Sequence, residues 1–416
     1  MPLLGTCGVA SSRGVGLLSV ANIGGPYWIG RLVDAAYGPI AVDLSGNVYL
    51  AITKTGSTIP VTVVKYNSFG VLQWQKEWSD AVFSHQVKYI GVDNSNNIYV
   101  VATIPSPVEA LIIKLDSNGN ILYNKRVDIT SGNLDARSGY LNPTTSELYV
   151  IGVDSATKST FVKYNSSLVG QFTRTLSDVN VQFNAITIDG SGNIFVGGFN
   201  NGSFNVCKYD SSANLLWQKE IYSSGNVLNV YGLATDSSGN VYATGYFYNG
   251  SIYVGFTIKI DSSGSLQWQT RLLGMTDGIN HSVAVDSNNS VYTCGYSDSN
   301  NAQLAKYDSS GNLQWQRSIT TPSQVYAISI KIDRSNNLYV GMTNNYFAKL
   351  PSDGSLTGTY SVGGASVTYQ TSTLTSNSTG LSFRSSTITS ATGSDITNNL
   401  SGTITSGTLT SSVTTL

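Results

Sequence analysis

Residues 282–319 carry the pattern that decides the fold, and they read SVAVDSNNSVYTCGYSDSNNAQLAKYDSSGNLQWQRSI. An apolar segment closes at Asp286, and a polar turn leads into a segment that contains Tyr292. A third segment carries Lys306, and after a second polar turn a fourth carries Trp315. Short apolar segments separated by Asp, Asn, Ser and Gly predict β-strands joined by tight turns. This stretch is therefore expected to form one small antiparallel sheet.

The same unit occurs seven times along the 416 residues. The residues that close the first segment are spaced by 47 to 50 positions, and they are Asp43, Asp93, Asn142, Asp189, Asp236, Asp286 and Asp333. The third segment always contains a lysine, namely Lys65, Lys114, Lys163, Lys208, Lys259, Lys306 and Lys349. Four short strands repeating at this period are typical of a propeller blade. The sequence predicts an all-β, seven-bladed β-propeller with four-stranded antiparallel blades.

Each unit also contains two aromatic positions. The first follows the turn, as Tyr49, Tyr99, Tyr149, Phe195, Tyr242, Tyr292 and Tyr339. The second lies in the fourth segment, as Trp74, Tyr123, Phe172, Trp217, Trp268 and Trp315, with Gly358 in the seventh unit. Large rings fill the wedge-shaped space between blades, so we expect a structural role. We expect the lysines to lay their stems along the sheet and to pair with a turn aspartate.

The missing tryptophan of the seventh unit has a candidate substitute near the N-terminus. Residues 27–34 read YWIGRLVD and resemble a fourth strand. Our hypothesis is that this strand joins the seventh blade and closes the ring, with Trp28 in the place left by Gly358. The expected organisation is an arm at 1–26, the propeller at 27–361 and a tail at 362–416.

Composition argues against several classes of protein. Charged residues are 11% of the chain and the formal net charge is −1, which provides no basic surface for nucleic acid. No apolar run reaches the roughly 20 residues that cross a bilayer, so membrane insertion is not expected. The N-terminus lacks a basic segment before its apolar patches, and we interpret it as an arm rather than a signal peptide. The three cysteines lie in different units, which predicts buried thiols rather than disulfides.

The Asp turns, such as DSSGN at 236–240, could suggest calcium sites. A calcium loop needs several oxygen ligands and a closing glutamate, whereas each turn supplies one carboxylate. An aspartate at this position instead accepts backbone hydrogen bonds within its own turn. We therefore expect turn caps, with no metal and no cofactor.

Two stretches resemble the SBBP-type β-propeller repeats: DSSGNVYATGY at Asp236–Tyr246 and KYDSSGNLQWQ at Lys306–Gln316. The resemblance extends over residues 38–361 and implies an architecture without a transferable catalytic motif. The third unit departs most, with LNPTTSELYV at 141–150, so its first hairpin is expected to be distorted.

The variation among the loops predicts which face of the propeller binds a ligand or partner. The first and third turns of each blade are uniform and share one face. The second turns and the links between blades differ from unit to unit and share the other face, which we call the variable face. Variable loops on a rigid scaffold usually carry binding sites. The candidate binding residues there are Trp78, Phe83, His85, Tyr222, Phe247, Tyr248 and His281.

Catalytic chemistry is sparse on the variable face. The two histidines belong to different blades and lack the third imidazole of a His-based metal site. We expect them to be exposed loop residues. Carboxylates occur at Glu77, Asp80, Asp128, Asp135 and Asp277, but no pair recurs at a spacing that marks a glycosidase.

The composition of the C-terminal tail indicates how the ends of the chain are held. Of its last 46 residues 26 are Ser or Thr, and several segments alternate apolar and hydroxyl residues as strands do. We expect other structural subunits to hold arm and tail, and a homo-oligomer is one such arrangement.

The low charge and the Thr, Asn and Gly content are similar to those of bacteriophage virion proteins, such as tail fibres and capsid decoration proteins. The leading interpretation is a non-enzymatic virion component that uses the propeller for display or adhesion, with a host-surface glycan as one candidate partner. The alternative is a bacterial surface or secreted carbohydrate-binding propeller, and the third is a propeller hydrolase or lyase.

Overall fold

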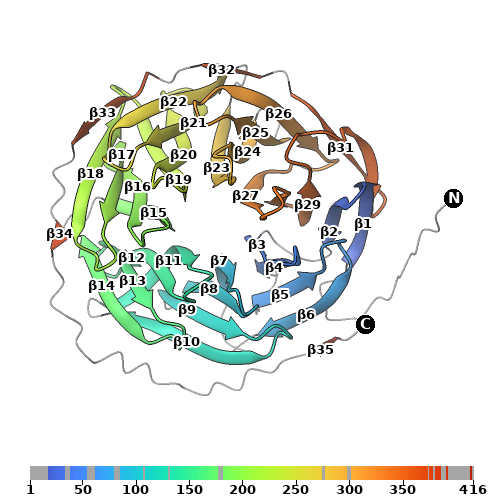
Figure 1. The fold of residues 1–416 in the computed structure, drawn as a ribbon, viewed down its shortest axis with the longest axis horizontal. Helices are drawn as coiled ribbons and strands as arrows, with labels where there is room; N and C mark the ends of the chain where they lie inside the picture. Colours follow the sequence, from blue (N-terminus) through green and yellow to red (C-terminus); the bar gives the residue numbers. More distant parts are fainter. Residues whose placement is uncertain are drawn as a thin grey trace.

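The computed structural model describes residues 17–32, 38–53, 61–78, 85–105, 108–129, 132–176, 181–273, 277–297, 301–372, 374–377, 380–385, 390–391 and 413–414. All regular elements in these ranges are strands, and they form seven blades around a central channel (Figure 1). None of the described residues belongs to a helix that could cross a membrane. The predicted seven-bladed all-β propeller is confirmed.

Each of the first four blades is an antiparallel meander that runs from the channel outward. Blade 1 contains β3 (Ile40–Val42), β4 (Val48–Thr53), β5 (Val61–Tyr66) and β6 (Leu72–Trp78). Blade 2 contains β7 (Gln86–Val92), β8 (Ile98–Pro105), β9 (Val108–Leu115) and β10 (Ile121–Ile129). Blade 3 contains β11 (Gly132–Leu141), β12 (Leu148–Asp154), β13 (Ser159–Tyr164) and β14 (Gly170–Leu176). Blade 4 contains β15 (Val181–Ile188), β16 (Ile194–Asn200), β17 (Ser203–Tyr209) and β18 (Leu215–Tyr222).

Blades 5 and 6 follow the same order, and blade 7 takes its outer strand from the N-terminus. Blade 5 contains β19 (Val227–Thr235), β20 (Val241–Tyr248), β21 (Tyr253–Ile260) and β22 (Leu266–Leu273). Blade 6 contains β23 (Gly278–Val285), β24 (Val291–Ser297), β25 (Asn301–Tyr307) and β26 (Leu313–Thr320). Blade 7 contains β27 (Ala327–Ile332), β28 (Leu338–Met342), β29 (Tyr346–Leu350), β2 (Tyr27–Leu32) and β1 (Leu17–Gly24).

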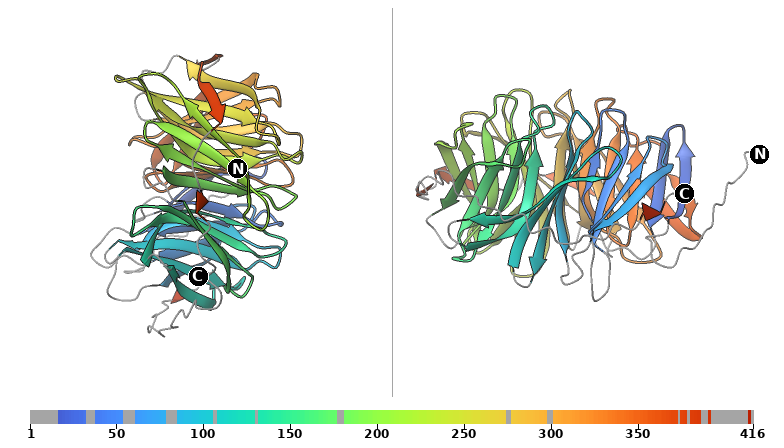
Figure 2. Two further views of the ribbon diagram at one scale, coloured as in Figure 1. Left: turned by 90° about the vertical axis from the view of Figure 1, so that its left-hand side faces the viewer. Right: turned by 90° about the horizontal axis from the view of Figure 1, so that it is seen from below.

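The hydrophobic core is divided among the seams between neighbouring blades. Each of seven clusters joins residues of two adjacent blades; one, for example, packs Phe204 and Val206 of blade 4 against Phe256 and Ile258 of blade 5. The strands stand across the thickness of a flat disc (Figure 2). Because one blade cannot cover both faces of its sheet, the ring supplies the burial that a single unit lacks.

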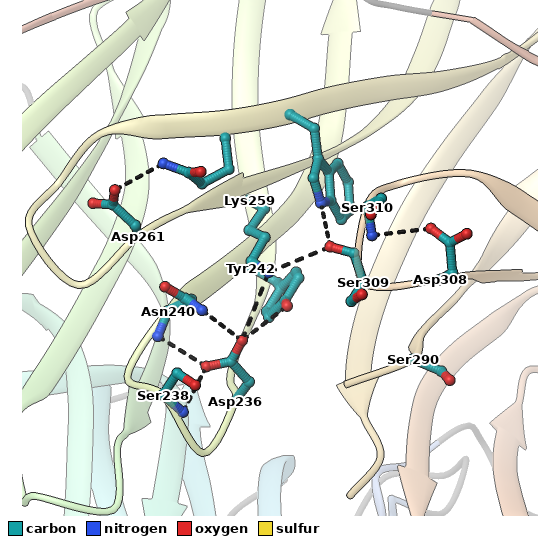
Figure 3. A network of polar contacts seen from close by, with 12 residues as sticks. Asp236, Ser238, Asn240, Tyr242, Lys259, Asp261, Ser290, Asp308, Ser309 and Ser310 are labelled. Atoms are coloured by element: carbon teal, nitrogen blue, oxygen red, sulfur yellow. Dashed lines mark hydrogen bonds and ion pairs between the residues drawn. The ribbon is translucent and has the colours of Figure 1, made fainter. Parts of the chain in front are cut away.

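The first turn of each blade is capped by its aspartate, or by Asn142 in blade 3. In blade 5, Asp236 accepts hydrogen bonds from the backbone of Ser238 and Asn240 and from the side chains of Asn240 and Tyr242 (Figure 3). Gly239, at φ 74°, takes the left-handed conformation that this tight turn requires. The predicted caps are confirmed.

The repeated lysine and tryptophan lock one blade to the next. Lys259 Nζ and Trp268 Nε1 both donate to the carbonyl oxygen of Ser309 in blade 6, at 3.3 and 3.0 Å (Figure 3). The lysine also lies over the Tyr242 ring, at 5.3 Å. Its principal partner is thus a carbonyl of the next blade rather than the expected turn aspartate, although Asp236 Oδ2 lies 3.9 Å away. The same double donation recurs at three other seams, from Lys65 and Trp74 to Ser117, from Lys208 and Trp217 to Ser262, and from Lys349 and Trp28 to Ser68.

The last of these seams joins blade 7 to blade 1. β2 pairs with β29, and Trp28 stands opposite Lys349, as Trp268 stands opposite Lys259 in blade 5. Trp28 is 1% exposed and packs edge-on against Phe347 at 5.3 Å. The position that Gly358 leaves empty in the repeat is therefore occupied by a tryptophan from the other end of the chain.

The C-terminal residues add strands to the outer edges of the blades. They are β30 (Gly358–Val362), β31 (Ala365–Thr371), β32 (Thr375–Asn377), β33 (Ser382–Ser385), β34 (Ser390–Ala391) and β35 (Val413–Thr414). From β31 onward these strands pair in turn with the outer strands of blades 6, 5, 4, 3 and 1 and follow the rim of the disc (Figure 1). We call β31 to β35 the belt. We expected partner subunits to hold arm and tail, but the described strands pair with this chain's own blades, whose outer edges offer unpaired backbone groups.

Two smaller expectations can be checked. The first turn of blade 3 is longer by one residue, because Asn142 N pairs with Glu147 O where Asp236 N pairs with Asn240 O. The predicted distortion of that hairpin is confirmed. Cys207 and Cys294 are buried free thiols, as predicted, whereas Cys7 lies outside the described residues.

Candidate functional site

A channel of about 820 Å³ runs through the centre of the ring. The innermost strand of every blade lines it, namely β3, β7, β11, β15, β19, β23 and β27. Its volume lies within the roughly 300–1,000 Å³ range of small-molecule sites. All seven blades contribute to the channel, so a ligand bound in it can contact several blades at once.

Six of these inner strands contain a β-bulge at the same position. One residue is skipped in each pairing with the second strand, and the skipped residues are Lys88, Arg137, Asn184, Tyr231, His281 and Ile328. Each lies five positions before the residue that closes the strand, and all six line the channel. In blade 1 the corresponding residue is Gly38, which also precedes its aspartate by five positions. We call these seven residues the bulge ring. Bulges re-aim side chains, and here they turn them toward the channel.

Glycines in the second strand make room for the bulges. A Cβ on Gly245 would lie 1.9 Å from Asn229 O, and one on Gly295 would lie 1.9 Å from Ile279 O. Gly152 and Gly198 have equally close backbone carbonyls, of Asp135 and Gln182. Blades 3 to 6 therefore carry glycine three positions after the repeated aromatic residue, whereas blades 2 and 7 form their bulges with Ala102 and Met342 at that position.

An aromatic strip extends from the bulge ring across the variable face of blades 5 to 7. Its rings are in sequential contact, at centroid distances of 4.4 to 5.9 Å, in the order Tyr248, Tyr253, Tyr246, Tyr231, His281, Tyr296 and Tyr326. Tyr231 and His281 are stacked, with an angle of 29° between their planes. Tyr231 and Tyr253 remain 36% and 37% exposed. The strip therefore offers the partly exposed rings of Tyr231 and Tyr253 to a ligand.

Burial favours the neutral forms of three residues of the strip, His281, Tyr296 and Tyr231. Burial lowers the pKa of His281 to about 4, and burial together with nearby Asp277 raises the pKa of Tyr296 to about 12. Burial and the Tyr246 hydroxyl also raise the pKa of Tyr231. A neutral imidazole and neutral phenols can stack and exchange hydrogen bonds, but they provide no net charge.

Blades 2 and 3 present charged groups to the same channel. Arg137 Nη2 lies 3.0 Å from Asp135 Oδ2, and Lys88 Nζ donates to Gln86 Oε1 at 3.1 Å. Burial lowers the pKa of Lys88, Asp135 raises it and Arg137 lowers it, so the three charges interact. This cationic cluster of Lys88, Asp135 and Arg137 has a net charge of +1. No group of three metal-ligating side chains occurs among the residues that the structure describes.

The structure distributes the predicted binding residues among different environments. Tyr248 and His281 belong to the aromatic strip, and Tyr222 is half-buried at the end of β18. Trp78 and Phe247 are buried in the core at 2% and 5% exposure, so they do not provide an exposed face. Their strands continue further than the sequence pattern suggested, and the ends pack between blades. Phe83 lies outside the described residues, as does Asp80.

The histidines differ from our expectation of exposed loop residues. His85 is 2% exposed. His281 is the bulge residue of β23 and lines the channel. β23 begins at Gly278, earlier than predicted, and this places His281 inside an inner strand, whereas His85 directly precedes β7, which begins at Gln86. Of the expected carboxylates, Asp135 belongs to the cationic cluster and Asp277 accepts a hydrogen bond from Tyr253 N.

Sequence reasoning missed the bulge ring and most of the aromatic strip. Two signals were available: the fixed spacing of five residues before the closing aspartate, and the recurring glycine three residues after the aromatic. Neither is informative until the backbone shows that these positions face each other across a bulge.

Comparisons with known proteins agree with the fold. Residues 217–246 match the family model of the SBBP beta-propeller repeat, and no curated protein matches the chain. The structure of Sqt1 from Chaetomium thermophilum has a TM-score of 0.54 at 11% identity, over 81% of this chain and 100% of that one. A chain of a mitotic checkpoint complex scores 0.53 at 11% identity, over 84% and 98%. YCF48 bound to D1 peptide scores 0.51 at 10% identity, over 80% and 98%. At these identities the likeness concerns the fold alone, and this chain is similar to repeat-built β-propellers.

Proposed function

We propose that this protein is a non-enzymatic binding scaffold that holds its ligand on the variable face, at the mouth of the central channel. The observation that carries the proposal is the aromatic strip, because seven rings from three blades form one partly exposed surface. Aromatic side chains dominate binding surfaces since they offer large contact area with little loss of conformational entropy. A repeat unit needs no such strip for folding, and blades 1 to 4 form their seams without one.

The fold supports an interaction role. One protein with a similar fold has been solved with a bound peptide, and another is part of a mitotic checkpoint complex. Propellers present loops from every blade around one opening, so a ligand there touches several blades at once. The described channel residues offer stacking and hydrogen bonding, and Asp135 is engaged by Arg137.

The location that we propose is a bacteriophage virion, as a tail fibre or capsid decoration component. The support is compositional: few charges, few cysteines and histidines, and a Ser/Thr-rich tail. The belt is consistent with this role, since a protein that must remain folded outside a cell benefits from a covered rim. Mass spectrometry of purified particles tests the location, and absence of the protein from them would contradict it.

The second candidate is a bacterial surface or secreted propeller that binds carbohydrate. The aromatic strip favours it, because the flat C–H face of a sugar ring stacks on tyrosine. A hydrolase or lyase remains a third class. It would require an acid and a base that converge on the channel within reach of one substrate.

Glycan and peptide arrays probed with the purified chain test the binding function. We expect the variants Tyr231→Ala and Tyr253→Ala to lose binding that the wild type shows. The matched control is Phe69→Ala, because Phe69 is 69% exposed and lies in a third turn, on the opposite face. If the strip variants bind as strongly as the wild type, the aromatic strip is not the binding site. If the wild type binds to neither array, the scaffold function is contradicted.

A further inference from the structure

The bulge ring places different chemistry on opposite sides of the channel. Lys88 and Arg137 come from blades 2 and 3, and Tyr231 and His281 come from blades 5 and 6. In a ring of seven, blades 2 and 5 are three steps apart, as are blades 3 and 6, which is the largest separation available. The inner strands β7 and β11 lie across the ring from β19 and β23 (Figure 1). A ligand in the channel can therefore meet Lys88 and Arg137 on one side and Tyr231 and His281 on the other.

The ring faces favour a sugar over an apolar anchor. Tyr231 and His281 stack at 5.5 Å and present polar edges, and the neighbouring channel residues are Asn184, Ser282 and Ser329. Asn184 Nδ2 donates to Asn229 Oδ1 at 2.9 Å. A saccharide combines C–H faces with outward hydroxyls, which matches rings set among amides and hydroxyls. A peptide anchor would need a dry pocket for an apolar side chain.

The cationic cluster favours an acid. Lys88, Asp135 and Arg137 sum to one positive charge, and the Lys88 ammonium is partly desolvated. An added carboxylate would restore the interactions that this ammonium lost with water. The planar Arg137 guanidinium has five donors, so it can bind Asp135 and a second carboxylate together.

We propose that the channel binds a carboxylated saccharide, with a sugar unit against the partly exposed Tyr231 ring beside His281 and a uronic carboxylate facing Lys88 and Arg137. This inference rests on the proposed binding function and specifies its ligand class. Tyr253 and Tyr246 extend the strip outward from the mouth, which provides places for further sugar units of a chain.

The test is calorimetric titration of the full chain with uronic-acid trisaccharides, of galacturonate, mannuronate and glucuronate type. Each is paired with its carboxyl methyl ester, which keeps the rings and removes the charge. We expect at least one acid to bind ten times more tightly than its ester. Lys88→Met should remove that difference, because the variant retains the length of the side chain without its charge. Tyr231→Ala should weaken acid and ester alike, and Phe69→Ala should change neither.

Three outcomes would overturn the inference while leaving the binding function intact. They are equal affinity for acid and ester, an acid preference that persists in Lys88→Met, and binding of an acidic peptide such as hexaglutamate with no saccharide bound. If the trisaccharides do not bind but the array signal still depends on Tyr231, the ligand class is wrong and the site is right. If neither the arrays nor the titrations show binding, the scaffold function fails as well. Thermal unfolding midpoints of all variants verify that each one folds.

Discussion

The seams between blades and the mouth of the channel are made from the same repeated unit, yet they tolerate different degrees of variation. At the seams, lysine recurs in all seven units, and its ammonium commonly donates to a backbone carbonyl of the next blade. In the bulge ring the seven residues all differ, as Gly38, Lys88, Arg137, Asn184, Tyr231, His281 and Ile328. A seam side chain must reach a fixed acceptor in the next blade, whereas the bulge residues of blades 2 to 7 line the channel and make different contacts in each blade. The seam positions keep the same residue type and stabilise the ring. The bulge positions keep the same place in the fold but vary in residue type, and we infer that they serve recognition.

The largest effect should come from the seam that closes the ring. Trp28→Ala removes a ring that is 1% exposed, its hydrogen bond to Ser68 O and its contact with Phe347. Truncation of a buried tryptophan typically costs about 3–5 kcal/mol. We expect a loss of that size in the free energy of unfolding, measured in urea. The matched control is Trp268→Ala, because Trp268 lies at an internal seam and is only half-buried. An equal or larger loss in that variant would show that the closing seam contributes no more to the free energy of unfolding than an internal seam.

A turn cap should matter less, and its weight should depend on burial. Asp236 is 5% exposed and accepts four hydrogen bonds, one of them from the Tyr242 hydroxyl. Asp261, in the third turn of the same blade, has a similar backbone pattern but is only half-buried. We expect Asp236→Asn to cost about 3 kcal/mol and Asp261→Asn below about 1 kcal/mol, because only the buried site leaves donors unsatisfied. Similar urea midpoints for the two variants would contradict the distinction.

The belt provides a third test, since it covers the rim without belonging to the repeat. Leu381 is 6% exposed and packs beside blade 4 and blade 5 residues, and its backbone N–H donates to Gln269 Oε1 at 3.1 Å. Leu381→Ala should cost about 2 kcal/mol, near the low end for a buried leucine because the site is peripheral. Leu216→Ala is the control, since that leucine is 53% exposed on β18. An unchanged unfolding midpoint in Leu381→Ala would mean that the belt does not hold to the disc in solution.

The smallest effect concerns pH at the channel mouth. Burial lowers the pKa of His281 from 6.5 to about 4, so between these values the unfolded chain binds a proton that the folded chain excludes. The folded state therefore loses stability as the pH falls from 6.5 toward 4, and the contribution is complete above pH 6.5. Relative to His281→Gln, we expect the wild type to lose about 1 kcal/mol more over this range, since channel water reduces the full effect. Parallel unfolding curves for the two proteins would show that this histidine is not desolvated.

The fold was largely predictable because its signals are local and repeated. Asp236 caps its own turn, Tyr242 follows at a fixed distance, and Lys259 with Trp268 recurs in register, so periodicity alone revealed blades and their number. The candidate site was less predictable. Tyr248 and His281 were predicted on the binding face and belong to the aromatic strip. Trp78 and Phe247 were predicted to be exposed there but are buried, because the sequence pattern near a strand end does not distinguish an aromatic residue that faces solvent from one that packs between blades.

The sequence by itself determined the propeller, its seven units, the capped turns and the candidate substitute for the missing tryptophan, since each depends on spacing within a unit or on one exception to it. Only the tertiary structure decided that Lys88, Arg137, Tyr231 and His281 share one channel mouth, and that the belt pairs with this chain's own rim. The physical reason is closure, because residues about 50 to 200 positions apart meet only when seven blades form a ring. The bulges that carry these residues are accompanied by a glycine on the neighbouring strand in blades 3 to 6 and by Ala102 and Met342 in blades 2 and 7, so the sequence alone does not identify them.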